Sequence, residues 1–101
     1  MKRYSIYIMS EALKDINAVY HYIAEVLMFP MTAIKYTDGI FYTIEELTTT
    51  AGIYAFSQNE FIQSRYGRES RAVQYKKMII IYNIVGNRVI VRRVIAGSLI
   101  R

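Results

Sequence analysis

The feature that most constrains this sequence is a nearly continuous apolar run, Met78–Val85, close to the C-terminus. A run of this length, rich in β-branched residues, predicts a central strand that is buried on both faces. The next two residues, Gly86-Asn87, adopt positive φ at low cost and therefore predict a two-residue turn. Arg88–Ala96 then predicts an antiparallel partner strand, which Gly97-Ser98 ends.

Two amphipathic helices are predicted ahead of this β-hairpin, because apolar residues recur three and four positions apart. The first set is Leu13, Ile16, Tyr20, Ile23 and Leu27, and the second is Ala33, Thr37, Ile40, Ile44 and Leu47, with Phe41 beside it. We expect Ser10 to cap the first helix and Pro30 to open the second. The first should end near Leu27–Phe29, and Thr48-Thr49-Thr50 with Gly52 should end the second.

The short link between the helices predicts an antiparallel helical hairpin, in which Gly39 allows close packing. The aromatic and β-branched residues of segment 3–9 predict a strand with Tyr4, Ile6 and Ile8 on one face. A second short strand is predicted at Arg71–Tyr75, followed by a turn at Lys76-Lys77. Residues 51–70 give no clear element, and we expect some of their apolar residues to cover an edge of the core: Ile53, Tyr54, Phe56, Phe61 and Ile62.

The order of these elements predicts one α+β domain over residues 1–101. An N-terminal strand comes first and an antiparallel two-helix hairpin follows it. A three-stranded antiparallel segment then completes a single sheet, which the helical hairpin covers.

The composition excludes several classes of function. The chain has no Cys and a single His, which excludes thiolate zinc sites, disulfide scaffolds and histidine-rich metal sites. The sequence has no Gly-rich phosphate loop either, and we expect neither a cofactor nor a metal. His21 and the pair Glu45-Glu46 are candidate acids or bases, although solvated helix positions explain them more simply. No stretch reaches the ~20 apolar residues of a membrane span, and we expect a soluble, cytoplasmic protein.

The net charge of +5 is divided unevenly along the chain. Residues 1–64 hold four basic and seven acidic residues, whereas residues 65–101 hold nine basic residues and one acidic residue. The basic third therefore predicts contact with an anionic partner, either nucleic acid or an acidic protein; a solvated basic face is the plainer alternative. The candidate binding residues are Arg65, Arg68, Arg71, Arg92, Arg93 and Tyr75.

Two of these arginines interrupt an apolar strand. Adjacent residues of a strand point to opposite faces, so either Arg92 or Arg93 should share the face of Val89, Val91 and Ile95. That arginine must be paired, reach solvent or belong to a site, because an unpaired buried charge is costly.

Several short motifs, taken in order, resemble the RelE/ParE toxin superfamily. The N-terminal motifs are Ser10-Glu11-Ala12-Leu13-Lys14-Asp15-Ile16, Tyr20-His21-Tyr22-Ile23-Ala24, and Pro30 with Ala33. The C-terminal motifs are Gly67-Arg68 through Arg71, the segment 75–84 and the segment 89–97. Each motif is weak alone, but their order and spacing cover most of the chain.

The resemblance implies a toxin of a bacterial type II toxin–antitoxin system, also called a plasmid stabilisation protein. A cognate antitoxin neutralises such a toxin through an acidic, partly disordered segment, for which a free sheet edge or the helical-hairpin groove offers a docking site. RelE-like members of the superfamily cleave mRNA on the ribosome, whereas ParE-like members act on DNA gyrase.

The residues of the nucleases are poorly matched in this chain. Their arginines fall at Ile79 and near Ser98 or Leu99, and their tail tyrosine has no counterpart before Arg101. Ala96 also stands where a histidine is common. The resemblance is therefore closer to ParE, and we expect a non-enzymatic poison of DNA gyrase.

Three alternatives stay open. One is a RelE-like, ribosome-dependent mRNA endonuclease, for which Arg68, Arg71 and Arg93 would have to converge on one face. The others are a basic nucleic-acid-binding module without a toxin role and an inactive relative of the toxins.

Overall fold

The computed structural model describes residues 3–100. The strands are β1 (Ser5–Ile8), β2 (Arg71–Tyr75), β3 (Met78–Val85) and β4 (Arg88–Ala96). The helices are α1 (Ser10–His21), α2 (Pro30–Thr50) and α3 (Glu60–Tyr66), with a π-helical turn, η1 (Tyr22–Val26), after α1 and a 3-10 turn, η2 (Gly97–Leu99), after β4. None of the helices within residues 3–100 is long and apolar enough to cross a membrane.

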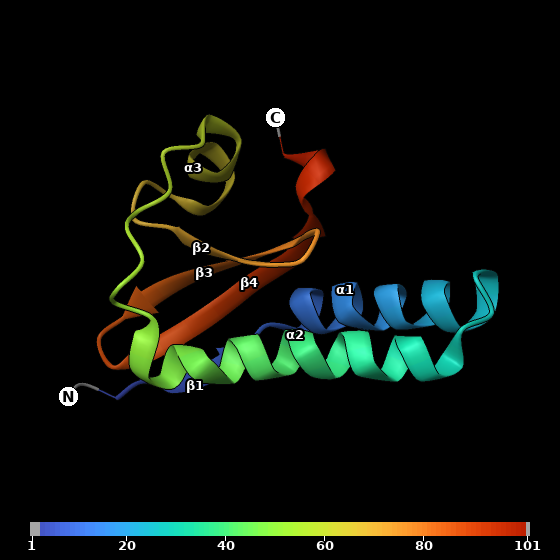
Figure 1. Cartoon of the computed structure of the whole chain (residues 1–101). Coiled ribbons are helices and arrows are strands. Elements are labelled where there is room, and N and C mark those ends of the chain that lie inside the picture. The colour runs from blue at the N-terminus through green and yellow to red at the C-terminus, as the bar shows by residue number, and fades with distance from the viewer. Residues whose placement is uncertain (1–2, 101) are drawn as a thin grey trace.

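The strands form one sheet in the order β1-β4-β3-β2. Strand β1 is parallel to β4, whereas β2–β3 and β3–β4 are antiparallel hairpins. Helices α1 and α2 form an antiparallel hairpin on one face of the sheet, and α3 lies on the opposite face (Figure 1). The expected α+β fold is confirmed, and β4 agrees with its predicted range at both ends.

The core lies between the helical hairpin and the sheet. All five apolar-stripe residues of α2 are buried, as predicted, because the stripe faces the sheet along its whole length. The sheet contributes Val73, Met78, Ile80, Tyr82, Val89, Val91 and Val94. Tyr4, Ile6 and Ile8 pack against this core from one face of β1, also as predicted.

The predicted stripe of α1 is wrong in part. Leu13 and Leu27 are exposed, and the side chains of this helix that reach the core are Ala12, Ile16 and Val19. The core-facing line is therefore rotated from the predicted one. Phe41 of α2 is also exposed rather than part of the buried stripe.

The close packing expected at Gly39 is confirmed. A Cβ atom on Gly39 would lie 1.9 Å from the hydroxyl oxygen of Tyr75, and the ring of Tyr75 meets the ring of Tyr36 edge-on at 5.4 Å. Glycine is required here because the aromatic ring at the end of β2 occupies the space of a side chain.

The predicted cap of α1 is wrong, whereas the predicted end of α2 is confirmed. Met9 rather than Ser10 occupies the N-cap of α1, and no side chain caps that end. Helix α2 ends at Thr50, the last of Thr48-Thr49-Thr50, and Gly52 follows its C-cap residue, Ala51. The three threonine hydroxyls donate to the carbonyls of Glu45 and Glu46 one turn back.

The segment that gave no clear element contains α3. The side chain of Asn59 caps this helix by accepting a hydrogen bond from the amide of Ile62 at 3.0 Å. Ile62 is buried, whereas Ile53, Tyr54 and Phe56 are exposed. Only part of the apolar segment therefore covers the core, and Phe56 instead bridges to Arg71 at the start of β2.

Strand β4 contains a β-bulge that the sequence did not reveal. The register pairs Tyr82 with Val91 and Ile81 with Arg93, so that Arg92 is an extra residue without a partner across the strands. The bulge places Val94 on the core face beside Val91, where strict alternation would place Arg93. The expectation that one arginine shares the face of Val89 and Val91 is therefore wrong, whereas Arg93 and Ile95 lie on the same, opposite side of β4 beyond the bulge.

Candidate functional site: an arginine cluster and an apolar groove

Arg92 connects the sheet to α3. Its Nη1 donates to Oδ1 of Asn83 at 2.8 Å, and its guanidinium lies 5.4 Å from the ring centroid of Tyr66. Asn83 in turn donates to the carbonyl of Tyr66 at 3.3 Å. These contacts hold a partly buried cation against the face of the sheet that α3 covers.

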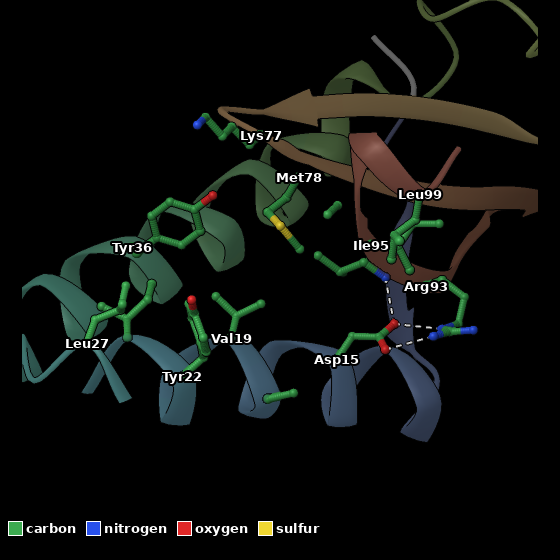
Figure 2. A pocket seen from close by; sticks show the side chains of 14 residues that line it. Asp15, Val19, Tyr22, Leu27, Tyr36, Lys77, Met78, Arg93, Ile95 and Leu99 are labelled. Atoms are coloured by element: carbon green, nitrogen blue, oxygen red, sulfur yellow. Dashed lines mark hydrogen bonds and ion pairs between the residues drawn. The ribbon is translucent and has the colours of Figure 1, made fainter. Parts of the chain in front are cut away.

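Arg93 connects the sheet to α1. Its Nε and Nη2 donate to the two carboxylate oxygens of Asp15 at 2.7 and 2.9 Å, and Oδ2 also accepts from the amide of Val94 at 2.9 Å (Figure 2). The hydrogen bond with Asp15 raises the pKa of Arg93 above its ordinary value. A bidentate pair of this kind neutralises the cation and fixes α1 on β4.

Arg71 lies on the other face of the sheet. It opposes Tyr82 across β2 and β3, and it alternates with Val73, so it shares their core-facing side. Its guanidinium lies 4.4 Å from the ring centroid of Phe56, and its Nη1 donates to the carbonyl of Tyr54. Within residues 3–100 its buried Nε has no hydrogen-bond partner. Arg71 therefore anchors the segment before α3.

The remaining candidates occupy different environments. Arg65 is exposed on α3, with its guanidinium 4.5 Å from the ring centroid of Phe61, and Arg68 is exposed in the following turn. Tyr75 packs beside α2 and belongs to the core margin. The structure thus gathers Arg65, Arg68 and Arg92 around α3, and it separates Arg71 and Tyr75 from them.

An apolar groove lies between the helical hairpin and the C-terminal end of β4 (Figure 2). Its volume is about 640 Å³. Its walls are Ala18, Val19, Tyr22, Ile23, Leu27, Tyr36, Met78, Val94, Ile95, Ala96 and Leu99, and its charged residues are Lys77 and the Asp15–Arg93 pair. These residues were not predicted to form a site. The available signal was a second apolar line beside the core stripe, formed by Ala18 of α1 and Tyr22 of η1, four residues apart.

The candidate acids and bases are surface residues. His21 is exposed and its Nδ1 lies 3.3 Å from Oε1 of Glu25 one turn away, while Glu45 and Glu46 are exposed on α2. In the part of the chain described, no group of three or more His, Cys, Asp or Glu residues is placed to hold a metal ion. The geometry offers cations for an anionic partner and a groove for an apolar one.

Comparison with known proteins adds a family to this geometry. Residues 6–99 match the family described as "ParE toxin of type II toxin-antitoxin system, parDE". A search of curated proteins gives no significant match.

Two solved structures share the fold. A structure described as the chromosomal ParDE toxin–antitoxin system of P. aeruginosa matches with a TM-score of 0.75 and 21% identity, over 93% of this chain and 96% of that one. The toxin–antitoxin complex RelBE2 from Mycobacterium tuberculosis matches with a TM-score of 0.60 and 11% identity, over 93% of this chain and 98% of that one. The fold is thus closer to the ParDE structure than to the RelBE2 structure.

Proposed function

Because this chain belongs to the ParE toxin family of type II toxin–antitoxin systems, we propose that it is a non-enzymatic poison of DNA gyrase that a cognate antitoxin neutralises. The proposal rests on the residues that stand where the resemblance places the arginines of the ribonuclease branch. Ile79 is a half-buried strand residue, and Leu99 is an apolar wall of the groove. Neither can stabilise the charge that develops at a phosphate during RNA cleavage.

The arginines that remain do not replace the missing ones. Arg93 is neutralised by Asp15, and Arg71 lies on the opposite face of the sheet from Arg92. A phosphoryl-transfer site needs several cations aimed at one group of oxygen atoms. The dispersed arrangement therefore favours binding over RNA cleavage.

The exposed cations around α3 are the proposed contacts for the anionic target. Arg65 and Arg68 are exposed, and Arg92 is held beside them by Asn83 and Tyr66. Cations held in place on one surface attract and orient a negatively charged partner. In this proposal they face the complex of gyrase with DNA.

The apolar groove is the proposed docking site for the antitoxin. Its lining is mostly aliphatic and aromatic, and Lys77 adds a positive charge at its margin. An amphipathic antitoxin segment with an apolar face and acidic flanks would complement this lining. The segment would bind across α1 and β4 without covering α3, which lies on the other face of the sheet (Figure 1).

Purified gyrase provides the direct test of the target. In a supercoiling reaction, the chain should reduce supercoiled product and accumulate cleaved DNA, while mRNA on translating ribosomes stays intact. The variant Arg68→Gln should weaken gyrase poisoning, because it removes an exposed cation. Arg88→Gln removes an exposed cation at the β3–β4 turn, away from α3, and should act like the wild type. Unaffected gyrase together with cleaved transcripts would establish the ribonuclease alternative instead.

Coexpression with the cognate antitoxin tests the groove. Leu99 is 60% exposed and lines the groove, so Leu99→Asp should leave the fold intact and place a carboxylate against the proposed acidic segment. We expect growth arrest to persist in the presence of the antitoxin. Ile53→Asp is the matched control, since Ile53 is 78% exposed and lies outside the groove lining. Equal neutralisation of both variants would place the antitoxin elsewhere.

A further inference from the structure

The bend of the helical hairpin exposes a continuous series of apolar side chains. These residues, called the tip patch, are Val26, Leu27, Met28, Phe29, Met31 and Ile34, with exposed fractions from 42% to 77%. The bend lies at the end of the hairpin that projects away from the sheet (Figure 1). No charged residue occurs between Glu25 and Lys35. A contiguous apolar surface of this kind marks an interaction site.

The backbone at Met28 provides an independent observation. Met28 has φ of 62° just beyond the end of η1, where a left-handed conformation favours glycine or asparagine. The side chain at this position is nevertheless large, apolar and 77% exposed. It makes the turn less favourable and is poorly buried within the chain, whereas a contact outside the chain would bury it.

The size and composition of the tip patch fit a homodimer. Taking about 200 Å² for a large side chain in full exposure, the patch presents on the order of 700 Å² per copy, and two copies would bury at most about 1,400 Å². That area lies within the range of specific interfaces. Transient interfaces are about as polar as ordinary surface, whereas homodimer interfaces are more apolar and are depleted of charge at the centre.

We propose that the tip patch is a two-fold interface with a second copy of this chain. A two-fold contact requires a surface that complements itself. An apolar centre satisfies this requirement, and the exposed flanking charges, Glu25 on one side and Lys35 on the other, are of opposite sign. Contact through the tips leaves the α3 arginines of both copies free. The interface is therefore a property separate from gyrase binding.

Sedimentation velocity of the purified full chain over a wide range of concentration tests the dimer. The wild type should shift from monomer to dimer as concentration rises. Met28→Gly should raise the dimer dissociation constant at least about tenfold by removing the central side chain. The same substitution should raise the thermal midpoint of the monomer, because glycine relieves the left-handed backbone. Loss of packing alone would not stabilise the monomer.

A second variant and a control keep the test sharp. Phe29→Ser should weaken the dimer in the same way, whereas Ile53→Ser, at another exposed apolar position, should leave it unchanged. A wild type that stays monomeric at every concentration would overturn the proposal. If the wild type is monomeric and the tip variants also lose gyrase poisoning, the patch contacts the target instead. If they lose binding to lipid vesicles, it contacts a lipid surface.

Discussion

Replacing Gly39 with alanine should destabilise this protein, although alanine is the best helix former and Gly39 lies within α2. In an open helix the change would stabilise by about 1 kcal/mol. Here the added methyl carbon would lie 1.9, 2.3 and 2.7 Å from Oη, Cζ and Cε1 of Tyr75. Two of these atoms, Cζ and Cε1, belong to the ring, so moving the hydroxyl alone cannot relieve the overlap and the whole ring must move.

The expected loss follows from what that ring holds in place. Overpacking a filled site costs about 1–3 kcal/mol, and displacing Tyr75 also sacrifices its edge-on contact with Tyr36, worth about 0.5–1.5 kcal/mol. Subtracting the helix-propensity gain leaves a net destabilisation of about 1–3 kcal/mol. For a domain of this size, a loss of 2 kcal/mol lowers the thermal midpoint by about 10 °C.

A double-mutant cycle with Tyr75→Val isolates the steric effect. Valine suits a strand position and removes the ring atoms that face Gly39. In that background Gly39→Ala has no ring to displace and should stabilise by up to about 1 kcal/mol. The same substitution thus changes sign, which corresponds to a coupling of about 2–4 kcal/mol, well above the ~0.5 kcal/mol scatter of independent sites.

Urea unfolding monitored by circular dichroism at 222 nm provides the four free energies of unfolding. Equal slopes in urea among the variants would show that the denatured states are comparable. If Gly39→Ala stabilises the wild type, or lowers the free energy of unfolding equally in both backgrounds, the contact with Tyr75 does not explain why position 39 requires glycine. A changed slope confined to the double variant would instead point to an altered denatured state.

Two further predictions concern polar contacts beneath the helical hairpin. Asp15→Ala removes three hydrogen bonds to β4 and should lower the free energy of unfolding in urea by about 2 kcal/mol. The loss is smaller than for a fully buried pair, because 34% of the Arg93 side chain is exposed. The control Glu11→Ala, at an exposed site on α1, should lower it far less. Burial raises the pKa of Tyr82, whose hydroxyl donates to the carbonyl of Ala51 at 2.7 Å. As the pH rises, the unfolded chain therefore loses this proton before the folded chain does, and the free energy of unfolding should fall above about pH 10. Unfolding of Tyr82→Phe measured at several alkaline pH values should show a smaller fall. An unchanged slope in the Tyr82→Phe protein would refute this assignment.

The elements that sequence patterns predicted well are those whose surroundings stay the same along their length. Helix α2 faces the sheet along its length, so all five residues of its predicted stripe are buried. Strand β3 forms ladders with both neighbours, and its apolar run predicted its full extent. In both elements a single environment acts along the whole segment, and local periodicity therefore reports the tertiary structure.

Helices α1 and α3 were harder to predict for opposite reasons. Helix α1 and the η1 turn after it carry apolar residues on the core face, along the groove and at the bend, so the predicted stripe wrongly included the exposed Leu13 and Leu27. Helix α3 has seven residues and a single buried one, Ile62. Its stability depends on the local cap by Asn59 and on the long-range contact of Arg92 with Tyr66, and neither contact produces a periodic apolar pattern.

The arginines show why charge in the sequence did not by itself define a site. Strict alternation in β4 would direct Arg93 to the core face, where it would have to be paired, reach solvent or belong to a site. The extra residue at the bulge instead keeps Val91 and Val94 in the core and leaves both arginines outside it. Arg92 then holds α3 and Arg93 holds α1, so one irregularity in a single strand secures helices on both faces of the sheet. Arg92 and Arg93, two of the nine basic residues of the C-terminal third, therefore stabilise the fold. Arg65 and Arg68 are exposed, so removing their charge should change binding without changing the fold.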